Sequence, residues 1–241
     1  MKKTNLQEIK NTAKCLFMAV PIETKGNLPV CLHPFTNNPF VLVKKGDQTE
    51  FVDARTKEGF EKYKNQMFEV IDKADSIFGI TMMLNSAYYM TFLKFTWKFM
   101  SAKDFGETLR DCWTQQEWPN RDNNVTHREL ISWFKKADKN TLMSEEDNAK
   151  LKELKAECLT KGIKLYRGVN QGGKPNGLSW TISKEKAEWF ANRWSNYGVK
   201  DGEVYTMLIT NPSCILAYFS DRNESEVIVD TIKIKDWVKL V

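Results

Sequence analysis

The sequence predicts an α+β protein with a mainly helical N-terminal portion and a C-terminal portion built on short strands. Apolar residues at three- and four-residue steps from Lys57 to Ala74 are typical of one face of a helix. Short apolar runs bounded by Pro, Gly and polar residues are typical of strands. With 41% hydrophobic and 12% aromatic residues, the chain has enough apolar material for a core. The runs interpreted as strands are 39–43, 50–52, 165–168, 178–181 and 224–230.

The N-terminal portion begins with a short amphipathic helix and continues into a hairpin whose turn lies at residues 45–47. Residues 77–100 are then apolar on nearly every helical face. Asn85, Lys94 and Lys98 interrupt them, so they lack the run of about 18 apolar residues that a membrane span needs. We expect one helix here, buried against the rest of the chain.

Further helices are marked by residues that can cap their ends. One helix is expected over residues 101–111. Thr126 and Glu129 have the spacing of a capping box at the start of the next. Ser144 precedes three acids that favour a helix N-terminus, and Gly162 suits the end of that helix.

We divide the chain into residues 1–109, mixed but mainly helical with a possible hairpin, and residues 110–241, which carry the last three strands. No stretch rich in Gly or Ser separates them. The formal net charge is +5 and is spread along the chain without a basic block. Charge alone therefore does not indicate a nucleic-acid partner.

Cysteine and histidine usage narrows the kinds of site that we expect. The five cysteines are far apart and lack zinc-type spacing, which is typical of buried hydrophobic residues in a reducing compartment, here the cytoplasm. His33 and His127 are the only histidines, too few for an obvious metal site or nucleophilic triad. The first apolar run, 15–20, is short and late, so we expect no signal peptide. Catalysis would have to depend on carboxylates and arginine, without a metal.

The last three predicted strands each carry polar side chains at one point: Arg167, Ser179 with Thr181, and Glu224 with Glu226. Because side chains alternate along a strand, Ser179 and Thr181 should share one face, and so should the two glutamates. We expect all five to converge on one cleft. A guanidinium, hydroxyls and a carboxylate pair suit a ligand with phosphates, ribose hydroxyls and a carbon that becomes cationic, such as a dinucleotide during cleavage.

In this order, these residues resemble the Arg, Ser-Thr-Ser and Glu-x-Glu motifs of the mono-ADP-ribosyltransferases related to bacterial toxins. Phe190 lies nine positions after Thr181 and Arg193 three after Phe190, a spacing that those enzymes often show. Trp180 and Thr181 stand where the family has Thr and Ser, although Thr181 keeps a hydroxyl. The segment from Asn123 onward also resembles phage and prophage proteins with the same motifs.

The resemblance implies an ADP-ribosyltransferase-like core of two packed, mostly antiparallel sheets. It implies that NAD is the substrate, cleaved at the nicotinamide-ribose bond, with transfer of ADP-ribose to a macromolecule. Glu226 would stabilise the oxocarbenium-like transition state, and Glu224 would orient or deprotonate the acceptor. Arg167 would hold a phosphate or ribose oxygen.

Five further roles follow from the same resemblance. Gly168 would let the backbone approach the nicotinamide closely. Ser179 and Thr181 would line the cleft and fix the catalytic carboxylate. Phe190 would stack on the nicotinamide and Arg193 would hold the second phosphate; both equally fit an ordinary helix, as a core residue and a solvated residue.

The acceptor stays open among three classes. In the family, Glu at position 224 accompanies arginine acceptors, so protein arginine is our first expectation. RNA or DNA is an alternative, because residues 218–223 match the turn that presents the substrate and contain aromatic and Arg residues. Water would make the chain an NAD glycohydrolase, and a non-catalytic module with this fold is a further alternative. A toxin or phage-host conflict factor would fit the family, with an inhibitory antitoxin as a partner and no membrane partner.

Overall fold

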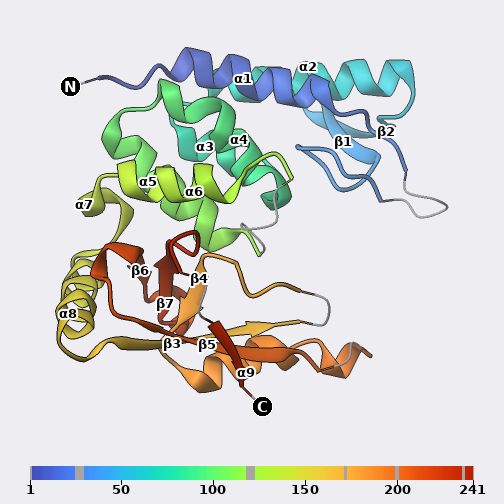
Figure 1. Cartoon of the computed structure of the whole chain (residues 1–241). Helices are drawn as coiled ribbons and strands as arrows, with labels where there is room; N and C mark the ends of the chain where they lie inside the picture. Colours follow the sequence, from blue (N-terminus) through green and yellow to red (C-terminus); the bar gives the residue numbers. More distant parts are fainter. Residues whose placement is uncertain are drawn as a thin grey trace. The chain divides into compact units, whose positions relative to one another are not determined.

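The computed structural model describes residues 2–24, 30–117, 123–170, 173–198, 201–234 and 237–240. The chain divides into two compact units, Met1–Val125 and Thr126–Val241 (Figure 1). The boundary that we predicted after residue 109 falls inside helix α5, Ala102–Gln115. This helix packs on α3 (Ile77–Thr81) and α4 (Tyr89–Thr96) of the first unit, so the whole of it belongs there. The division therefore comes later than the sequence indicated.

The first unit is mainly helical, as predicted, and contains the predicted hairpin. Strands β1 and β2 pair antiparallel, and Gly46 takes a φ of 62° in the turn between them. Helix α2 packs on both strands. The described elements before α5 are α1 (Leu6–Ala19), β1 (Phe40–Lys45), β2 (Gln48–Asp53), α2 (Lys57–Lys73), α3 (Ile77–Thr81), η1 (Ser86–Tyr88), α4 (Tyr89–Thr96) and η2 (Trp97–Phe99).

The prediction of one helix over residues 77–100 is wrong. The segment forms the two short helices α3 and α4 with 3-10 turns after Leu84 and Thr96. The break occurs because the Asn85 side chain accepts from the backbone N–H of Ala87, and the Asn85 N–H donates to the carbonyl of Pro34. The first bond is local and the second is long-range, and both take backbone N–H groups that a continuous helix would use. The predicted burial holds in part: Met90, Phe92 and Leu93 are inaccessible to solvent, whereas Phe78, Met82 and Phe95 are exposed.

The second unit contains one antiparallel sheet flanked by helices. The strand order is β6-β7-β4-β3-β5-β8. Helices α6 and α8 pack on β6, and α9 packs on β3. The described elements are α6 (His127–Lys136), α7 (Lys139–Leu142), α8 (Glu145–Lys161), β3 (Ile163–Val169), β4 (Ser179–Thr181), α9 (Lys184–Asn192), η4 (Ser195–Tyr197), β5 (Glu203–Ile209), η5 (Pro212–Cys214), β6 (Ile215–Phe219), η6 (Asp221–Asn223), β7 (Glu226–Val229) and β8 (Trp237–Leu240).

Three helix ends of this unit are those that the sequence predicted: the start of α6 and both ends of α8. Thr126 and Glu129 form the capping box of α6, with both reciprocal bonds present. The Ser144 hydroxyl accepts from the backbone N–H of Asp147 at the start of α8. Gly162 follows α8 with a φ of 76°, a conformation that glycine adopts without steric cost.

The sheet of the second unit differs from the expected pair of packed sheets. The antiparallel character is confirmed, but all six strands join into one hydrogen-bonded sheet. The join is narrow: β4 has three residues, which all pair with β7, whereas its described pairing with β3 is the single pair Tyr166 and Thr181. The sheet thus consists of two three-stranded halves connected at one point.

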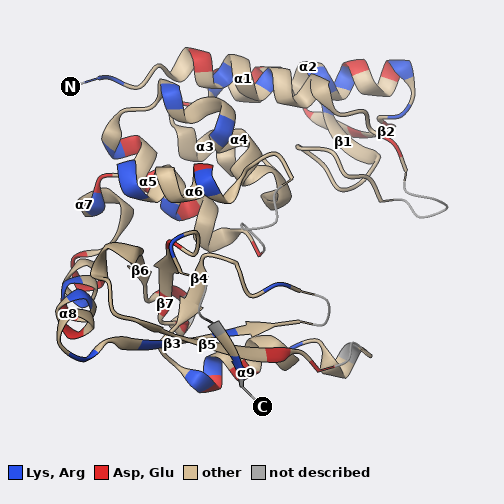
Figure 2. Cartoon of the chain, viewed as in Figure 1, with Lys and Arg blue, Asp and Glu red and all other residues tan. Residues whose placement is uncertain are grey.

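Charged residues of both signs are spread along the helices (Figure 2). On α2, for example, Lys62 pairs with Glu58 and Lys73 with Glu69 one helical turn away. This mixing agrees with the even spread of charge along the sequence. In the part of the chain that the structure describes, no helix is both long and apolar enough to cross a membrane.

Candidate active site

Three neighbouring strands of the second unit carry most of the predicted site residues. Arg167 lies on β3, Ser179 and Thr181 on β4, and Glu226 at the start of β7, and these strands are consecutive in the sheet. Tyr166, Thr181 and Glu226 pair across the three strands in one row. Thr181 and Glu226 share a strand face, because they are paired across the strands. Arg167 follows Tyr166, the partner of Thr181, and so starts from the other face. Since neighbouring strands are about 4.8 Å apart, the Cα atoms of Arg167 and Glu226 are separated by roughly 10 Å.

The side chain of Arg167 is anchored to the neighbouring strand. Its Nη1 donates to the carbonyl of Ser179. The guanidinium lies directly against Gly177, where a Cβ atom would be 2.4 Å from Nη2. Gly177 therefore provides the space that the guanidinium occupies. Our sequence analysis did not select Gly177; the one available signal was a glycine just before the polar strand.

Gly168 has a packing role that the sequence did not predict. A Cβ atom there would lie 2.0 Å from the carbonyl oxygen of Ala187 and 2.6 Å from the backbone nitrogen of Ala191. The missing side chain thus lets α9 pack against β3. The side of Gly168 that a side chain would take is filled by α9, so the predicted close approach to a nicotinamide is not available on that side.

Strand β4 alternates as predicted, but the Thr181 hydroxyl is engaged by the protein itself. Trp180 is buried and its Nε1 donates to the Gly177 carbonyl at 2.9 Å. The Thr181 Oγ1 donates to the carbonyl of Glu224 at 2.9 Å and accepts from the Ser183 N–H at 3.1 Å. Ser179 is half-buried. The Thr181 hydroxyl therefore connects β4 to the turn before β7.

The predicted common strand face of Glu224 and Glu226 is wrong. Strand β7 begins only at Glu226, whereas Glu224 has helical backbone angles, φ −92° and ψ −16°. Ser225, between the two glutamates, has a φ of 48°, and Asn223, just before Glu224, has a φ of 56°. These left-handed residues belong to a tight turn that the sequence analysis extended as strand. Glu226 is 8% exposed and lies opposite both Thr181 and Phe219.

Helix α9 carries Phe190, and Arg193 follows at its end. Phe190 lies close to Gly168, its Cβ 2.9 Å from the position that a Gly168 Cβ would take. The Arg193 guanidinium lies 5.4 Å from the Phe190 ring and 5.1 Å from the Trp194 ring, within cation–π distance. Both residues are half-buried. Phe190 therefore lies on a helix that packs on β3, the strand of Arg167, and Arg193 directly follows that helix.

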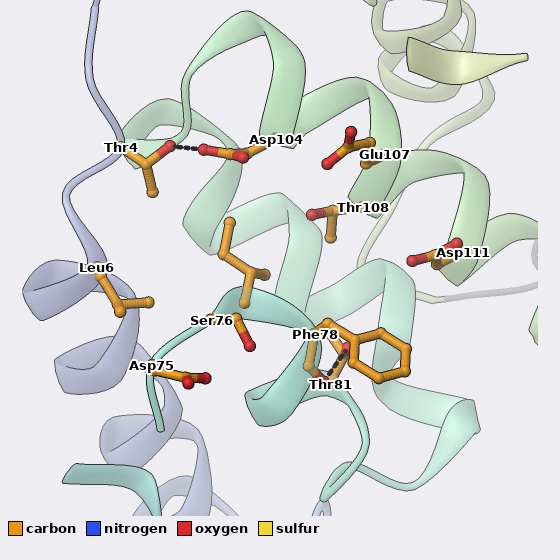
Figure 3. Close-up of a pocket in the computed structure, with 11 residues that line it drawn as sticks. Thr4, Leu6, Asp75, Ser76, Phe78, Thr81, Asp104, Glu107, Thr108 and Asp111 are labelled. Atoms are coloured by element: carbon orange, nitrogen blue, oxygen red, sulfur yellow. Dashed lines mark hydrogen bonds between the residues drawn. The ribbon is translucent and has the colours of Figure 1, made fainter. Parts of the chain in front are cut away.

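The first unit contains a separate pocket of about 330 Å³ that our sequence analysis missed. Acidic residues of α5, with Thr108, lie on one side of it, and Asp75 and Ser76 lie on another (Figure 3). The only sequence signal was the spacing of Asp104, Glu107 and Asp111 along one helix face. Asp104 serves the fold, since its carboxylate accepts from the hydroxyls of Thr4 and Ser101. The pocket is acidic, and none of the motif residues of β3, β4 and β7 lines it.

No group of three or more His, Cys, Asp or Glu residues in the described ranges has an arrangement that could hold a metal ion. The described cysteines are all unpaired thiols, and burial raises the pKa of Cys112, Cys158 and Cys214. A raised pKa keeps a thiol protonated and unreactive. Four of the five cysteines are buried, as predicted, but the prediction is wrong for Cys15, which is exposed on α1.

Comparison with known proteins gives no match. No family model matches the chain, and neither do curated proteins or solved structures. A function can therefore be argued only from the residues and their geometry.

Proposed function

We propose that the chain is an NAD-dependent mono-ADP-ribosyltransferase that cleaves the nicotinamide-ribose bond and transfers ADP-ribose to a macromolecule. The observation that carries the proposal is the adjacency of β3, β4 and β7, whose motif residues are far apart in the sequence. An arginine, a serine and a buried glutamate thereby lie on consecutive strands. Their order along the chain is that of the motifs that the sequence resembles.

Glu226 is the proposed catalytic carboxylate. The departure of nicotinamide leaves positive charge on the ribose, and a fixed carboxylate stabilises that charge more than water does, because it needs no reorganisation. Glu226 is held in place by strand pairing on both sides, to β4 and to β6. Its low exposure also reduces screening of its charge by solvent.

Arg167 is the proposed anchor for a phosphate or ribose oxygen of NAD. A guanidinium offers a planar fork of donors that a lysine lacks. Its bond to the Ser179 carbonyl and its packing against Gly177 restrict its orientation before a ligand arrives. Phe190 and Arg193, next to β3 on α9, would contact the nicotinamide and the second phosphate.

Glu224 is the residue proposed to orient or deprotonate the acceptor. It lies in a half-buried turn and not in the strand. We put protein arginine first, RNA or DNA second and water third. In each case the acceptor O–H or N–H loses its proton, nicotinamide leaves, and the acceptor atom bonds to the ribose carbon. A cytoplasmic toxin or phage-host conflict factor remains the proposed setting, and an inhibitory antitoxin the proposed regulatory partner.

Incubation of the full chain with NAD labelled on the adenylate half and with cell extract tests the proposal. Label that becomes macromolecular and is released by protease means a protein acceptor, and label released by nuclease means a nucleic-acid acceptor. Free labelled ADP-ribose alone means a glycohydrolase. If the folded chain binds NAD without cleaving it, the non-catalytic alternative is correct, and if it neither binds nor cleaves NAD, the family assignment fails.

A further inference from the structure

Asp147 is a buried carboxylate that reaches from helix α8 to the turn before β7. It is the third residue of α8 and is 1% exposed. Its Oδ1 accepts from the backbone N–H of Ser220 at 3.1 Å. The start of α8 is already capped by the Ser144 hydroxyl, which accepts from the Asp147 N–H at 3.0 Å. The Asp147 carboxylate is therefore directed to the turn and is not needed as the helix cap.

The turn from Ser220 to Ser225 has an unusual backbone. Asn223 and Ser225 have φ values of 56° and 48°, which cost energy for residues other than glycine. Inside the turn the Asn223 N–H donates to the Ser220 carbonyl at 3.0 Å. Such a conformation persists only when surrounding contacts determine it.

Two side chains from outside tie this turn at its two ends. Asp147 binds the N–H of Ser220 at the first end, and the Thr181 hydroxyl binds the Glu224 carbonyl at the other. Glu226 does not depend on the first tie, because strand pairing holds it from both sides. Loss of the Asp147 bond should therefore free the Ser220 end of the turn. It should leave Glu224 held by the Thr181 bond alone, and leave Glu226 in place.

The second carboxylate oxygen of Asp147 indicates that this residue does more than stabilise the fold. Oδ2 is buried and has no hydrogen-bond partner in the described part of the chain. Burial of a carboxylate oxygen without a partner is costly. A residue kept for stability alone would satisfy both oxygens or be replaced by an uncharged side chain.

We infer that Asp147 is a positioning residue that holds the Ser220–Ser225 turn, and through it Glu224, in the geometry needed for transfer to the acceptor. The second half of this inference rests on the proposed function. Its consequence is specific: Asp147 controls the partition between ADP-ribose transfer and NAD hydrolysis, whereas Glu226 controls both reactions.

The variants Asp147→Ala and Asp147→Asn separate the hydrogen bond from the charge, because Asn keeps an acceptor oxygen for the Ser220 N–H. Ser220→Pro removes the N–H that donates to Asp147. It is the variant to use if Asp147→Ala does not fold. Asp138→Ala is the matched control: Asp138 caps the short helix α7 through the Asn140 N–H and makes no described bond to the turn.

The first measurement is amide hydrogen exchange of the full chain, which needs no substrate. We expect the Ser220 and Glu224 amides to exchange about tenfold faster or more in Asp147→Ala, and near the wild-type rate in Asp147→Asn and Asp138→Ala. The amides of β7 should be unchanged. Unchanged exchange at Ser220 and Glu224 in Asp147→Ala overturns the inference whatever the chain catalyses.

The second measurement is the ratio of transfer to hydrolysis, which does not depend on how much of the protein is folded. We expect this ratio to fall about tenfold in Asp147→Ala and to recover in Asp147→Asn. Faster exchange with an unchanged ratio overturns the positioning role. A wild-type chain that cleaves no NAD overturns the proposed function and the partition with it, while the exchange result still decides whether Asp147 holds the turn.

Discussion

Arg167 owes its position to a neighbour that has no side chain. The guanidinium fills the space beside Gly177 and reaches the backbone of β4 there. On β4, the Thr181 hydroxyl donates to the carbonyl of Glu224 and so holds the turn that carries this residue. Single atoms thus determine where the candidate groups lie, and three predictions can be made at this scale.

Gly177→Ala should displace the Arg167 guanidinium, because the new Cβ would lie 2.4 Å from Nη2. We expect kcat/KM for NAD cleavage to fall by about tenfold to a hundredfold with the fold retained, as misplacement of a binding group does. Gly79→Ala is the control, since its Cβ would meet nothing closer than 3.4 Å. Wild-type NAD affinity in Gly177→Ala, measured by calorimetry, would remove Arg167 from the site.

Glu226→Gln keeps the shape of the side chain and removes its charge. We expect NAD cleavage to fall by about a hundredfold or more, because the loss falls on the transition state. Glu224→Gln should suppress transfer while hydrolysis to free ADP-ribose continues. Equal loss of both reactions in the two variants would contradict this division of roles.

His33 should make the first unit sensitive to acid. Its Nε2 bonds to the Phe17 carbonyl at 2.9 Å and its Nδ1 accepts from the Phe35 N–H at 3.2 Å, which is the neutral tautomer with the proton on Nε2. Burial lowers the His33 pKa below its usual 6.5. Between the folded and unfolded pKa values the unfolded chain binds more protons, so stability is lost as the pH falls below 6.5.

The measurement is the free energy of unfolding by denaturant between pH 7.5 and 5, compared with His33→Gln. Glutamine offers a donor and an acceptor but does not titrate. The wild-type chain should lose more stability than the variant over this range. Parallel pH profiles would show that His33 does not carry the effect.

At the scale of elements, the packing of α9 on β3 depends on Gly168. The helix backbone occupies the space where any other residue would place its Cβ atom. The helix also brings Phe190 and Arg193 next to the strand of Arg167. Helix docking and site geometry are therefore linked at this glycine.

Gly168→Ala should destabilise the second unit by about 1–3 kcal/mol, the usual cost of forcing extra atoms into a packed contact. The predicted ligand role would give a different result, namely weaker NAD binding at unchanged stability. Thermal unfolding and calorimetric titration of the same sample distinguish the two. Gly79→Ala, on the first unit, again serves as the control.

At the scale of the whole molecule, the chain consists of two units, each with its own buried apolar residues. The motif residues all lie in the second unit and the acidic pocket lies in the first. Fragments separated after Val125 can therefore be used to test each unit by itself.

A fragment that begins at residue 126 should fold with native-like circular dichroism, whereas one that begins at residue 110 should be more prone to aggregation. The longer fragment keeps half of α5 and exposes Cys112 and Trp113, which are buried in the first unit. Light scattering and thermal unfolding of the two fragments compare them. Equal solubility of both fragments would contradict the boundary after Val125.

Local signals in the sequence determined several helix ends and one turn, but did not predict β5, β6 or β8. The capping box at Thr126, the Ser144 cap, the Gly162 stop and the turn at Gly46 were all predicted and are present. These features depend on bonds between residues a few positions apart, so the order of residues is sufficient to predict them. The identity and order of the motif residues were also available from the sequence.

Only the tertiary structure decided what those residues contact. It joined β3, β4 and β7, assigned Gly168 to helix packing, and engaged the Thr181 hydroxyl with the turn at Glu224. It also took Glu224 out of the strand that period-two alternation predicted for it. Each of these outcomes depends on atoms that are distant in sequence and close in space, where strand pairing, steric exclusion and long-range hydrogen bonds outweigh local preference.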